Sequence, residues 1–280
     1  MSDMRHKQQK DENFPVASFL LGKENRKIVT AYYNFARYGD DIADNPDLSE
    51  AEKTKRLEQL EQALYGKAGR ETEAHQIAEP LRKAFIAENL SFSLASDLLT
   101  AFRQDAACFH YETWGQLMAY CQHSAAPVGR FLLALHNENP STYLPANALC
   151  AALQIVNHVQ DLKYDAKTLK RVYIPDELFR RFDVSPSALT RAKSSKALKL
   201  LVKEIMSRTD GRCGDFTVDC AESAAETRNL RYLFLNQYYG KKNIKRRCFD
   251  RYDQAEQTRL VLRHDWRHLQ RFAHPAQNFD

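Results

Sequence analysis

Apolar side chains follow a helical period along most of this chain. Between residues 26 and 44 they recur at the three- and four-residue spacing that forms one face of a helix; they are Ile28, Tyr32, Phe35, Ala36 and Ile42. Ser49 suits the N-cap of a second helix that continues to Leu64, and Pro46 and Asp47 mark the connection between the two. The pattern therefore predicts two successive helices joined by a short turn.

The helical period continues to about residue 207, and alternating strand patterns are scarce. Further helices are predicted for residues 73–88, 91–105, 111–137, 146–166 and 188–207. Pro127 falls inside one of these ranges, so a kink or a break is expected there. A series of helices with short connections predicts an all-α fold, a single-domain helical bundle whose core can contain a binding site.

The composition is that of a soluble globular protein, since 44% of the 280 residues are apolar and 28% are charged. No apolar run reaches the roughly 18 residues that a transmembrane helix needs, and the polar N-terminus lacks the apolar stretch of a secretory signal. The expected location is the cytoplasm, with peripheral contact at the inner face of the membrane as an open alternative. Residues 1–12 are predicted to be disordered.

Cysteine spacing and charge argue against several other classes of protein. The six cysteines are widely spaced and form no CxxC pair, so they are expected to be reduced thiols, and zinc-site spacing is absent. The net charge of +5 favours attraction to anionic headgroups or to a diphosphate. No nucleic-acid partner is expected, because the positive charge forms no compact patch outside residues 241–247. Four histidines are expected to be structural or surface groups: His110, His123, His136 and His158.

The first candidate site is an acidic cluster near the end of the first predicted helix. Asp40 and Asp44 lie four positions apart and project on one face, with Asp41 beside them. Like charges at this spacing destabilise a helix unless a cation lies between them, and carboxylate oxygens are ligands that Mg²⁺ prefers. The alternative is a solvated acidic turn. Because the adjoining residues 32–36 are apolar enough to be buried, the cluster is expected to border a cleft.

A second polar stripe occurs in the helix predicted for residues 146–166. Asn157, Asp161 and Asp165 follow one another at intervals of four and extend along about 12 Å of helix. Alone, such a stripe is more often a polar helix face. Two stripes facing each other across a bundle would repel unless Mg²⁺ ions and a diphosphate lay between them. Because such ions stabilise a departing diphosphate, the pair of stripes predicts ionisation chemistry.

Further motifs accompany the two stripes along the chain: Asn13-Phe-Pro-Val-Ala-Ser18, Phe102-Arg-Gln-Asp105, the stretch 111–130 and Arg171-Val-Tyr173-Ile-Pro175. In this order they resemble the squalene and phytoene synthase family, and most closely its bacterial hydroxysqualene synthases. The resemblance covers residues 13–180. It implies a bundle of the isoprenoid synthase type with a central cavity, which is expected to occupy residues 13–207.

The resemblance also implies a role for each matching residue at the site. The expected metal ligands are Asp40, Asp44, Asn157, Asp161 and Asp165. The four aspartates of this set are also the expected catalytic residues, together with Tyr173, which would orient the diphosphate. Arg37 and Arg171 would contact diphosphate oxygens, because a guanidinium offers a fork of donors. For Arg37, the alternative is an ion pair within its own helix.

Four further positions are implied with less specific roles. Ser18 would contact the diphosphate, although a helix N-cap is an equally good interpretation. Phe35 and Tyr120 would line the cavity, and core packing is the alternative for both. Gly129 would permit close approach of the substrate or of a neighbouring helix. Asp41 is expected not to ligate the metal directly.

The implied reaction is the Mg²⁺-dependent loss of diphosphate from presqualene diphosphate, rearrangement of the carbocation and capture by water to give hydroxysqualene. No NADPH is expected, in agreement with the absence of a G-x-G-x-x-G fingerprint. Within the family, the alternative is a condensing synthase that makes presqualene diphosphate, dehydrosqualene or phytoene. Outside this chemistry, the alternatives are a non-catalytic scaffold of the same fold and a nucleic-acid binder.

Residues 208–280 depart from the pattern of the preceding chain. They contain a basic cluster, three of the six cysteines and few apolar stripes. The resemblance implies apolar helices at this point, which would close the cavity. Strong divergence and an altered reading frame both explain the difference, and the segment is treated as a separate C-terminal region.

Overall fold

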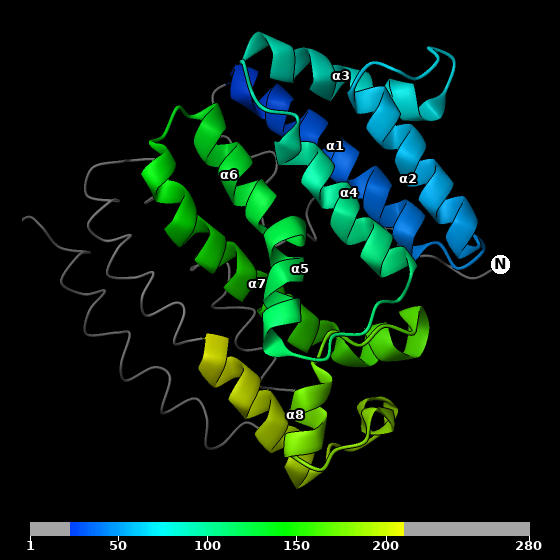
Figure 1. Ribbon diagram of the computed structural model, residues 1–280, viewed down its shortest axis with the longest axis vertical. Helices are drawn as coiled ribbons and strands as arrows, with labels where there is room; N and C mark the ends of the chain where they lie inside the picture. The colour runs from blue at the N-terminus through cyan, green and yellow to red at the C-terminus, as the bar shows by residue number, and fades with distance from the viewer. Residues whose placement is uncertain (1–22, 210–280) are drawn as a thin grey trace, which may run out of the picture. The chain divides into compact units, whose positions relative to one another are not determined.

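The computed structural model describes residues 23–209, which are helical without any strand (Figure 1). The α-helices are α1 (Lys23–Asp44), α2 (Glu50–Leu64), α3 (Glu73–Ala87), α4 (Ser93–Ala106), α5 (Trp114–Ser124), α6 (Ala126–Leu135), α7 (Tyr143–Tyr164) and α8 (Asp176–Arg181). Short 3₁₀ turns occupy Pro140–Thr142 and Pro186–Thr190, a π-turn occupies Asp165–Leu169, and residues 196–209 are again helical. The predicted all-α class is confirmed. None of the helices in the described range is both long and apolar enough to cross a membrane.

Side-chain caps determine where several helices begin. Ser49, Thr72 and Thr113 each accept a hydrogen bond from the backbone N–H three residues further on, at 3.3, 3.2 and 3.3 Å. These caps satisfy backbone donors that have no partner within the first turn of a helix. The predicted N-cap at Ser49 is thus confirmed, and α1 to α4 follow the predicted ranges closely.

Two of the predicted helices differ from the structure. The range 111–137 is divided into α5 and α6, and Pro127 stands in the first turn of α6, where a missing N–H costs nothing. This is the expected break. The range 188–207 is wrong at its start, because the helix begins only at residue 196, where the N–H of Leu198 donates to Ser195 Oγ at 3.1 Å. The short helix α8 was not predicted, since six residues are too few to show a period.

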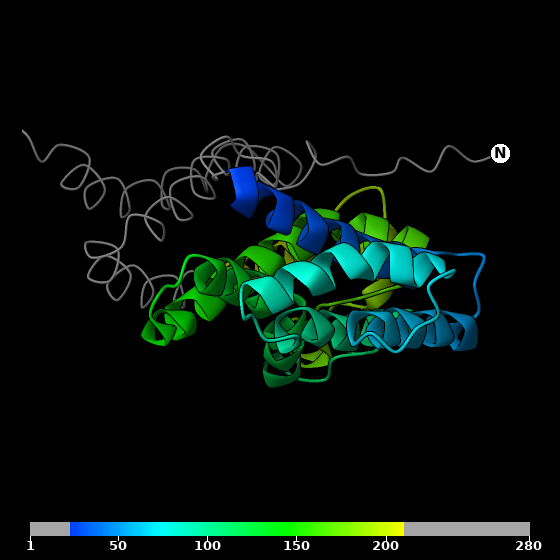
Figure 2. The same ribbon diagram turned by 90° about the horizontal axis from the view of Figure 1, so that it is seen from above.

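α4 lies at the centre of the described bundle. It packs against α1, α2, α5 and α6, and α7 packs against α5 and α6 (Figures 1 and 2). Two apolar cores result. The first joins α1, α2, α3, α4 and α6, and the second joins the end of α4 with α5, α7, α8 and the helix at 196–209. α4 therefore contributes to both cores.

Two glycines allow neighbouring helices to approach closely. A Cβ atom at Gly39 of α1 would lie 2.7 Å from the ring of Phe102 on α4, and one at Gly129 of α6 would lie 2.7 Å from Sγ of Cys150 on α7. Both distances are too short for a side chain, so only glycine permits these crossings without displacement. For Gly129, the close approach of α7 explains why a glycine occupies this position.

Candidate active site

The C-terminal end of α1 gathers negative charge that the helix does not neutralise itself. Asp40, Asp41 and Asp44 lie near this end, and the last turn contains no basic residue. Carboxylates are disfavoured there, because the helix dipole places partial negative charge at the same end. Cations from other positions supply the balance. One of them is Lys53 of α2, whose Nζ donates to the carbonyl oxygen of Ala43 at 2.8 Å.

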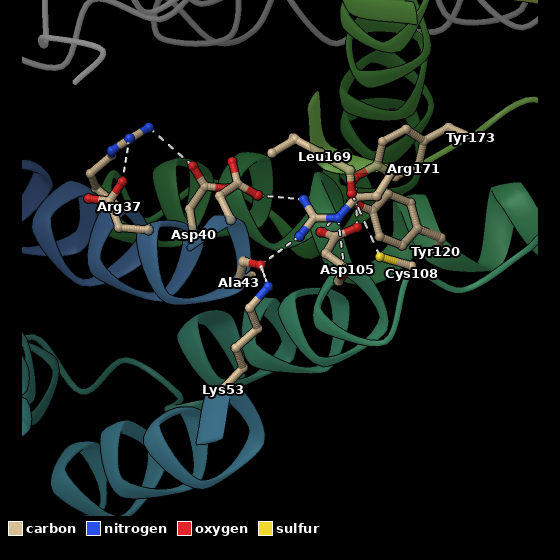
Figure 3. Close-up of polar contacts among 12 residues, drawn as sticks. Arg37, Asp40, Ala43, Lys53, Asp105, Cys108, Tyr120, Leu169, Arg171 and Tyr173 are labelled. Carbon is tan, nitrogen blue, oxygen red and sulfur yellow. Dashed lines mark hydrogen bonds and ion pairs between the residues drawn. The ribbon is translucent and has the colours of Figure 1, made fainter. Parts of the chain in front are cut away.

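Arg37 supplies positive charge from within α1. Its Nη1 donates to Asp40 Oδ2 at 3.1 Å, and its Nη2 pairs with Asp41 (Figure 3). The ion pair that was the alternative for Arg37 is therefore present. Because these side chains are partly exposed, each pair contributes no more than about 1 kcal/mol. Arg37 can thus exchange a carboxylate for a more highly charged oxyanion at little cost.

Arg171 connects the two acidic motifs. Its buried guanidinium pairs with Asp44 and donates to the carbonyl oxygens of Ala43 at 2.7 Å and Asp105 at 2.8 Å (Figure 3). Its backbone N–H donates to the carbonyl oxygen of Asp165 at 3.1 Å. Burial lowers the pKa of Arg171, but the nearby acidic groups, Asp105 foremost, outweigh this and raise it. A permanently charged guanidinium therefore joins α1, α4 and the end of α7.

Asp105 is a buried carboxylate whose role the sequence motifs did not predict. It accepts hydrogen bonds from the hydroxyls of Tyr173 at 2.7 Å and Tyr120 at 2.9 Å. Burial raises the pKa of Asp105 to about 6, although Arg171 and the two hydroxyls oppose that rise. A signal was available, because Asp105 follows Leu98 by seven positions and so continues the buried face of α4.

The polar stripe of α7 runs into the π-turn that follows the helix. Asn157 and Asp161 are half-buried on α7, and Asp165 is buried at the start of the turn. The turn ends at Lys170, whose φ of 59° is left-handed. π-turns are rare in proteins overall, but those that occur are often found at functional sites. Here the wider turn and the left-handed residue bring the backbone of Arg171 back to Asp165.

His158 adjoins the stripe and packs against the tyrosines. Its ring stacks on that of Tyr173, with centroids 3.7 Å apart and planes inclined by 17°, and lies 5.9 Å from the ring of Tyr120. Burial, reinforced by the charge of Arg171, lowers the pKa of His158 to about 3, so its imidazole is neutral. Of the two roles expected for His158, structural or surface, the structure shows a buried structural position. His158 follows the buried Ile155 by three positions and so lies on the same face of α7.

The remaining predicted residues are not part of this cluster. Phe35 is fully buried in the first apolar core, so core packing describes its position. Gly129 lies at the crossing of α6 and α7. Ser18 lies outside the described residues, as do residues 1–12 and the C-terminal region beyond residue 209.

Oxygen ligands for a hard cation are present on both α1 and α7. Within the described range, however, no group of three His, Cys, Asp or Glu side chains lies close enough together to hold a metal ion. Mg²⁺ commonly binds one or two carboxylates and completes its coordination with phosphate oxygens and water. The donor set therefore suits Mg²⁺ that binds together with a diphosphate, and not a metal held by protein side chains alone.

The same helical fold occurs in solved isoprenoid synthases. A squalene synthase from Alicyclobacillus acidocaldarius matches with a TM-score of 0.69 at 24% identity, over 86% of this chain and 91% of that chain. A dehydrosqualene synthase solved with a ligand matches with a TM-score of 0.69 at 22% identity, over 92% and 88% of the two chains. The bundle is therefore an isoprenoid synthase fold.

Sequence comparison identifies the family, whereas the structural similarity identifies the fold. The squalene/phytoene synthase family matches residues 7–217. A hydroxysqualene synthase from Rhodopseudomonas palustris is 41% identical over 209 residues, which are 75% of this chain and 70% of that protein. One from Zymomonas mobilis is 39% identical over 210 residues, 72% and 69% of the two proteins. A 15-cis-phytoene synthase from Enterobacter agglomerans is 26% identical over 202 residues, 70% and 68%. This chain belongs to the squalene/phytoene synthase family and is an isoprenoid-processing synthase, as its motifs predicted.

Proposed function

We propose that this chain is a hydroxysqualene synthase, which ionises presqualene diphosphate, rearranges the resulting carbocation and captures it with water. Its identity to hydroxysqualene synthases reaches 41%, against 26% for a phytoene synthase. The structural observation that carries the proposal is the contact between Arg171 and Asp44. Because the backbone N–H of Arg171 also donates to Asp165, Arg171 links one end of each acidic motif. A diphosphate that reaches this point would meet guanidinium groups and carboxylates at once.

The guanidinium groups would bind the leaving group. Arg37 and Arg171 currently pair with carboxylates of α1, and both would turn donors toward diphosphate oxygens, for which a guanidinium fork is well suited. Arg171 is also anchored by two backbone carbonyls, so its position would be kept during the exchange. Tyr173, whose hydroxyl donates to the same Asp105 that contacts Arg171, would help to orient this group.

The carboxylates would bind metal together with the substrate. Mg²⁺ would be held by Asp40 and Asp44 from α1 and by Asn157, Asp161 and Asp165 from α7, with phosphate oxygens completing its shell. When bound, the metal stabilises the negative charge that develops on the departing diphosphate.

The tyrosines would form the boundary between the polar and apolar parts of the site. Tyr120 and Tyr173 direct their hydroxyls toward Asp105 and their rings toward the second apolar core. A wall of this kind shields a carbocation from bulk water, which would otherwise intercept it before rearrangement. The scheme requires no NADPH, because the product retains the oxygen of water.

Product analysis tests the proposal directly. The full chain is incubated with presqualene diphosphate, with and without Mg²⁺, and in parallel with farnesyl diphosphate. We expect hydroxysqualene from presqualene diphosphate only when Mg²⁺ is present, and no product from farnesyl diphosphate alone. Formation of presqualene diphosphate, dehydrosqualene or phytoene from a simple prenyl diphosphate would instead identify a condensing synthase.

A further inference from the structure

His158 carries a buried hydrogen-bonding atom that the described residues leave unsatisfied. The residue is only 9% exposed, and its Nε2 has no hydrogen-bond partner within residues 23–209. A buried polar atom without a partner costs free energy, and native proteins contain few of them. The diphosphate-binding and metal-binding roles proposed above do not use this atom.

The imidazole lies between the polar stripe of α7 and a small apolar cavity. His158 directly follows Asn157 and precedes Asp161 by three positions, so it borders the stripe on the helix surface. The cavity beside it is lined by His158, by Tyr173 and otherwise by aliphatic side chains, which come from α5, α7, the segment before α8 and the helix at 196–209. His158 is therefore a polar group on a largely apolar wall, next to the proposed metal ligands.

The neighbouring tyrosine hydroxyls are already engaged. Tyr173 and Tyr120 both donate their hydroxyl protons to the carboxylate of Asp105. The ring of Tyr173 stacks on the imidazole at 3.7 Å and so fixes its plane. Among the described residues of this wall, Nε2 of His158 is the nitrogen left to bind a small polar molecule.

We infer that Nε2 of His158 binds the water molecule that ends the reaction, an inference that rests on the proposed function. A lone pair of the water oxygen forms the new C–O bond to the carbocation. One O–H bond breaks with its electron pair remaining on oxygen, and the proton passes to the released diphosphate, the oxyanion that ionisation produces. The surrounding wall is apolar and offers Nε2 of His158 as a hydrogen-bond partner. It can therefore hold one water molecule at this nitrogen while it excludes bulk water.

Replacement of His158 tests this assignment. His158→Phe keeps a ring that can stack on Tyr173 and removes the nitrogens, whereas His158→Gln keeps a group that can bind water. Each variant is incubated with presqualene diphosphate and Mg²⁺, and diphosphate release and product composition are measured separately. In His158→Phe we expect diphosphate release close to that of the unmodified protein. The share of hydroxysqualene should fall about tenfold in favour of olefins formed by proton loss, the factor that one lost hydrogen bond allows. His158→Gln should recover part of it.

His75→Phe is the matched control. His75 lies on α3, and it too has a buried ring nitrogen, Nδ1, without a partner among the described residues. Its replacement should leave the product composition unchanged. If His158→Phe does not fold, as judged by circular dichroism, His158→Leu is measured in its place.

Two results would overturn the inference. One is an unchanged share of hydroxysqualene in the folded His158 variant that lacks the nitrogens. The other is loss of diphosphate release in that variant and in His158→Gln, both with normal circular dichroism, since this would place His158 in the ionisation step. If the unmodified protein does not consume presqualene diphosphate, the proposed function fails, which is a separate outcome.

Discussion

Arg171 and Asp44 form an ion pair although 127 positions separate them in the chain. The pair lies where α1 ends and where the chain leaves the π-turn after α7. The side chain of Asp44 is partly exposed, whereas that of Arg171 is buried. The carboxylate is therefore in contact with solvent, and the guanidinium is held by the buried carbonyl oxygens of Ala43 and Asp105. This arrangement leaves the acidic side of the pair accessible to a ligand.

Arg171→Lys should impair both stability and turnover. Lysine keeps the charge but lacks the planar fork whose three nitrogens reach Asp44 and the carbonyls of Ala43 and Asp105. We expect the free energy of unfolding to fall by about 2–3 kcal/mol and turnover of presqualene diphosphate to fall by about 100-fold. Thermal unfolding and diphosphate release measure the two effects. The exposed Lys167, replaced by glutamine, serves as control and should change neither; a fully active Arg171→Lys variant would contradict the assignment.

Asp40→Asn and Asp161→Asn should separate folding from catalysis. Each replacement keeps the size of the side chain and removes the charge of one proposed metal ligand, so turnover should fall by about 100-fold or more. Far-UV circular dichroism should remain unchanged, because both side chains are only half-buried. Asp47→Asn, in the exposed turn after α1, is the matched control. Turnover at the rate of the unmodified protein in either variant would remove that residue from the metal site.

Asp105→Asn should change how stability depends on pH. The pKa of Asp105 is raised by burial to about 6 in the folded protein, above its unfolded value of 3.8. The folded state therefore binds the proton more tightly, so the contribution is greatest at low pH and is lost as pH rises through 6. Relative to Asp105→Asn, the unmodified protein should lose about 2 kcal/mol between about pH 4.5 and pH 7.5. Chemical denaturation of both proteins at these pH values measures the difference, and parallel profiles would show that Asp105 does not titrate as described.

Gly39→Ala should destabilise the crossing of α1 and α4. The added Cβ would lie 2.7 Å from the ring of Phe102, so the ring or the helix must shift, at a cost of about 1–3 kcal/mol. Gly115→Ala is the matched control, because the nearest atom to a Cβ on this exposed glycine of α5 is Thr113 Oγ1 at 3.7 Å. That variant should instead gain about 0.5–1 kcal/mol from reduced backbone entropy of the unfolded chain. Thermal unfolding compares them, and equal effects would argue against close packing at Gly39.

Features that depend on nearby residues were predictable from the sequence alone. The ranges of α1 to α4, the cap at Ser49 and the break at Pro127 follow from residue spacing, capping chemistry and the missing N–H of proline. The two polar stripes follow in the same way, since residues four positions apart share a helix face. Family membership rested on short motifs in a fixed order, which the comparisons confirm.

Features that depend on distant residues were decided only by the tertiary structure. Helical period predicts which face of a helix is buried but not which residue it meets, so the meeting of Arg171 with Asp44 and the stack of His158 on Tyr173 could not be predicted. The raised pKa of Asp105 likewise arises from its removal from water by several helices at once. Local spacing therefore determined the helices and the polar stripes, whereas packing determined which charges are buried, which are paired and which nitrogens are left without a partner among the described residues.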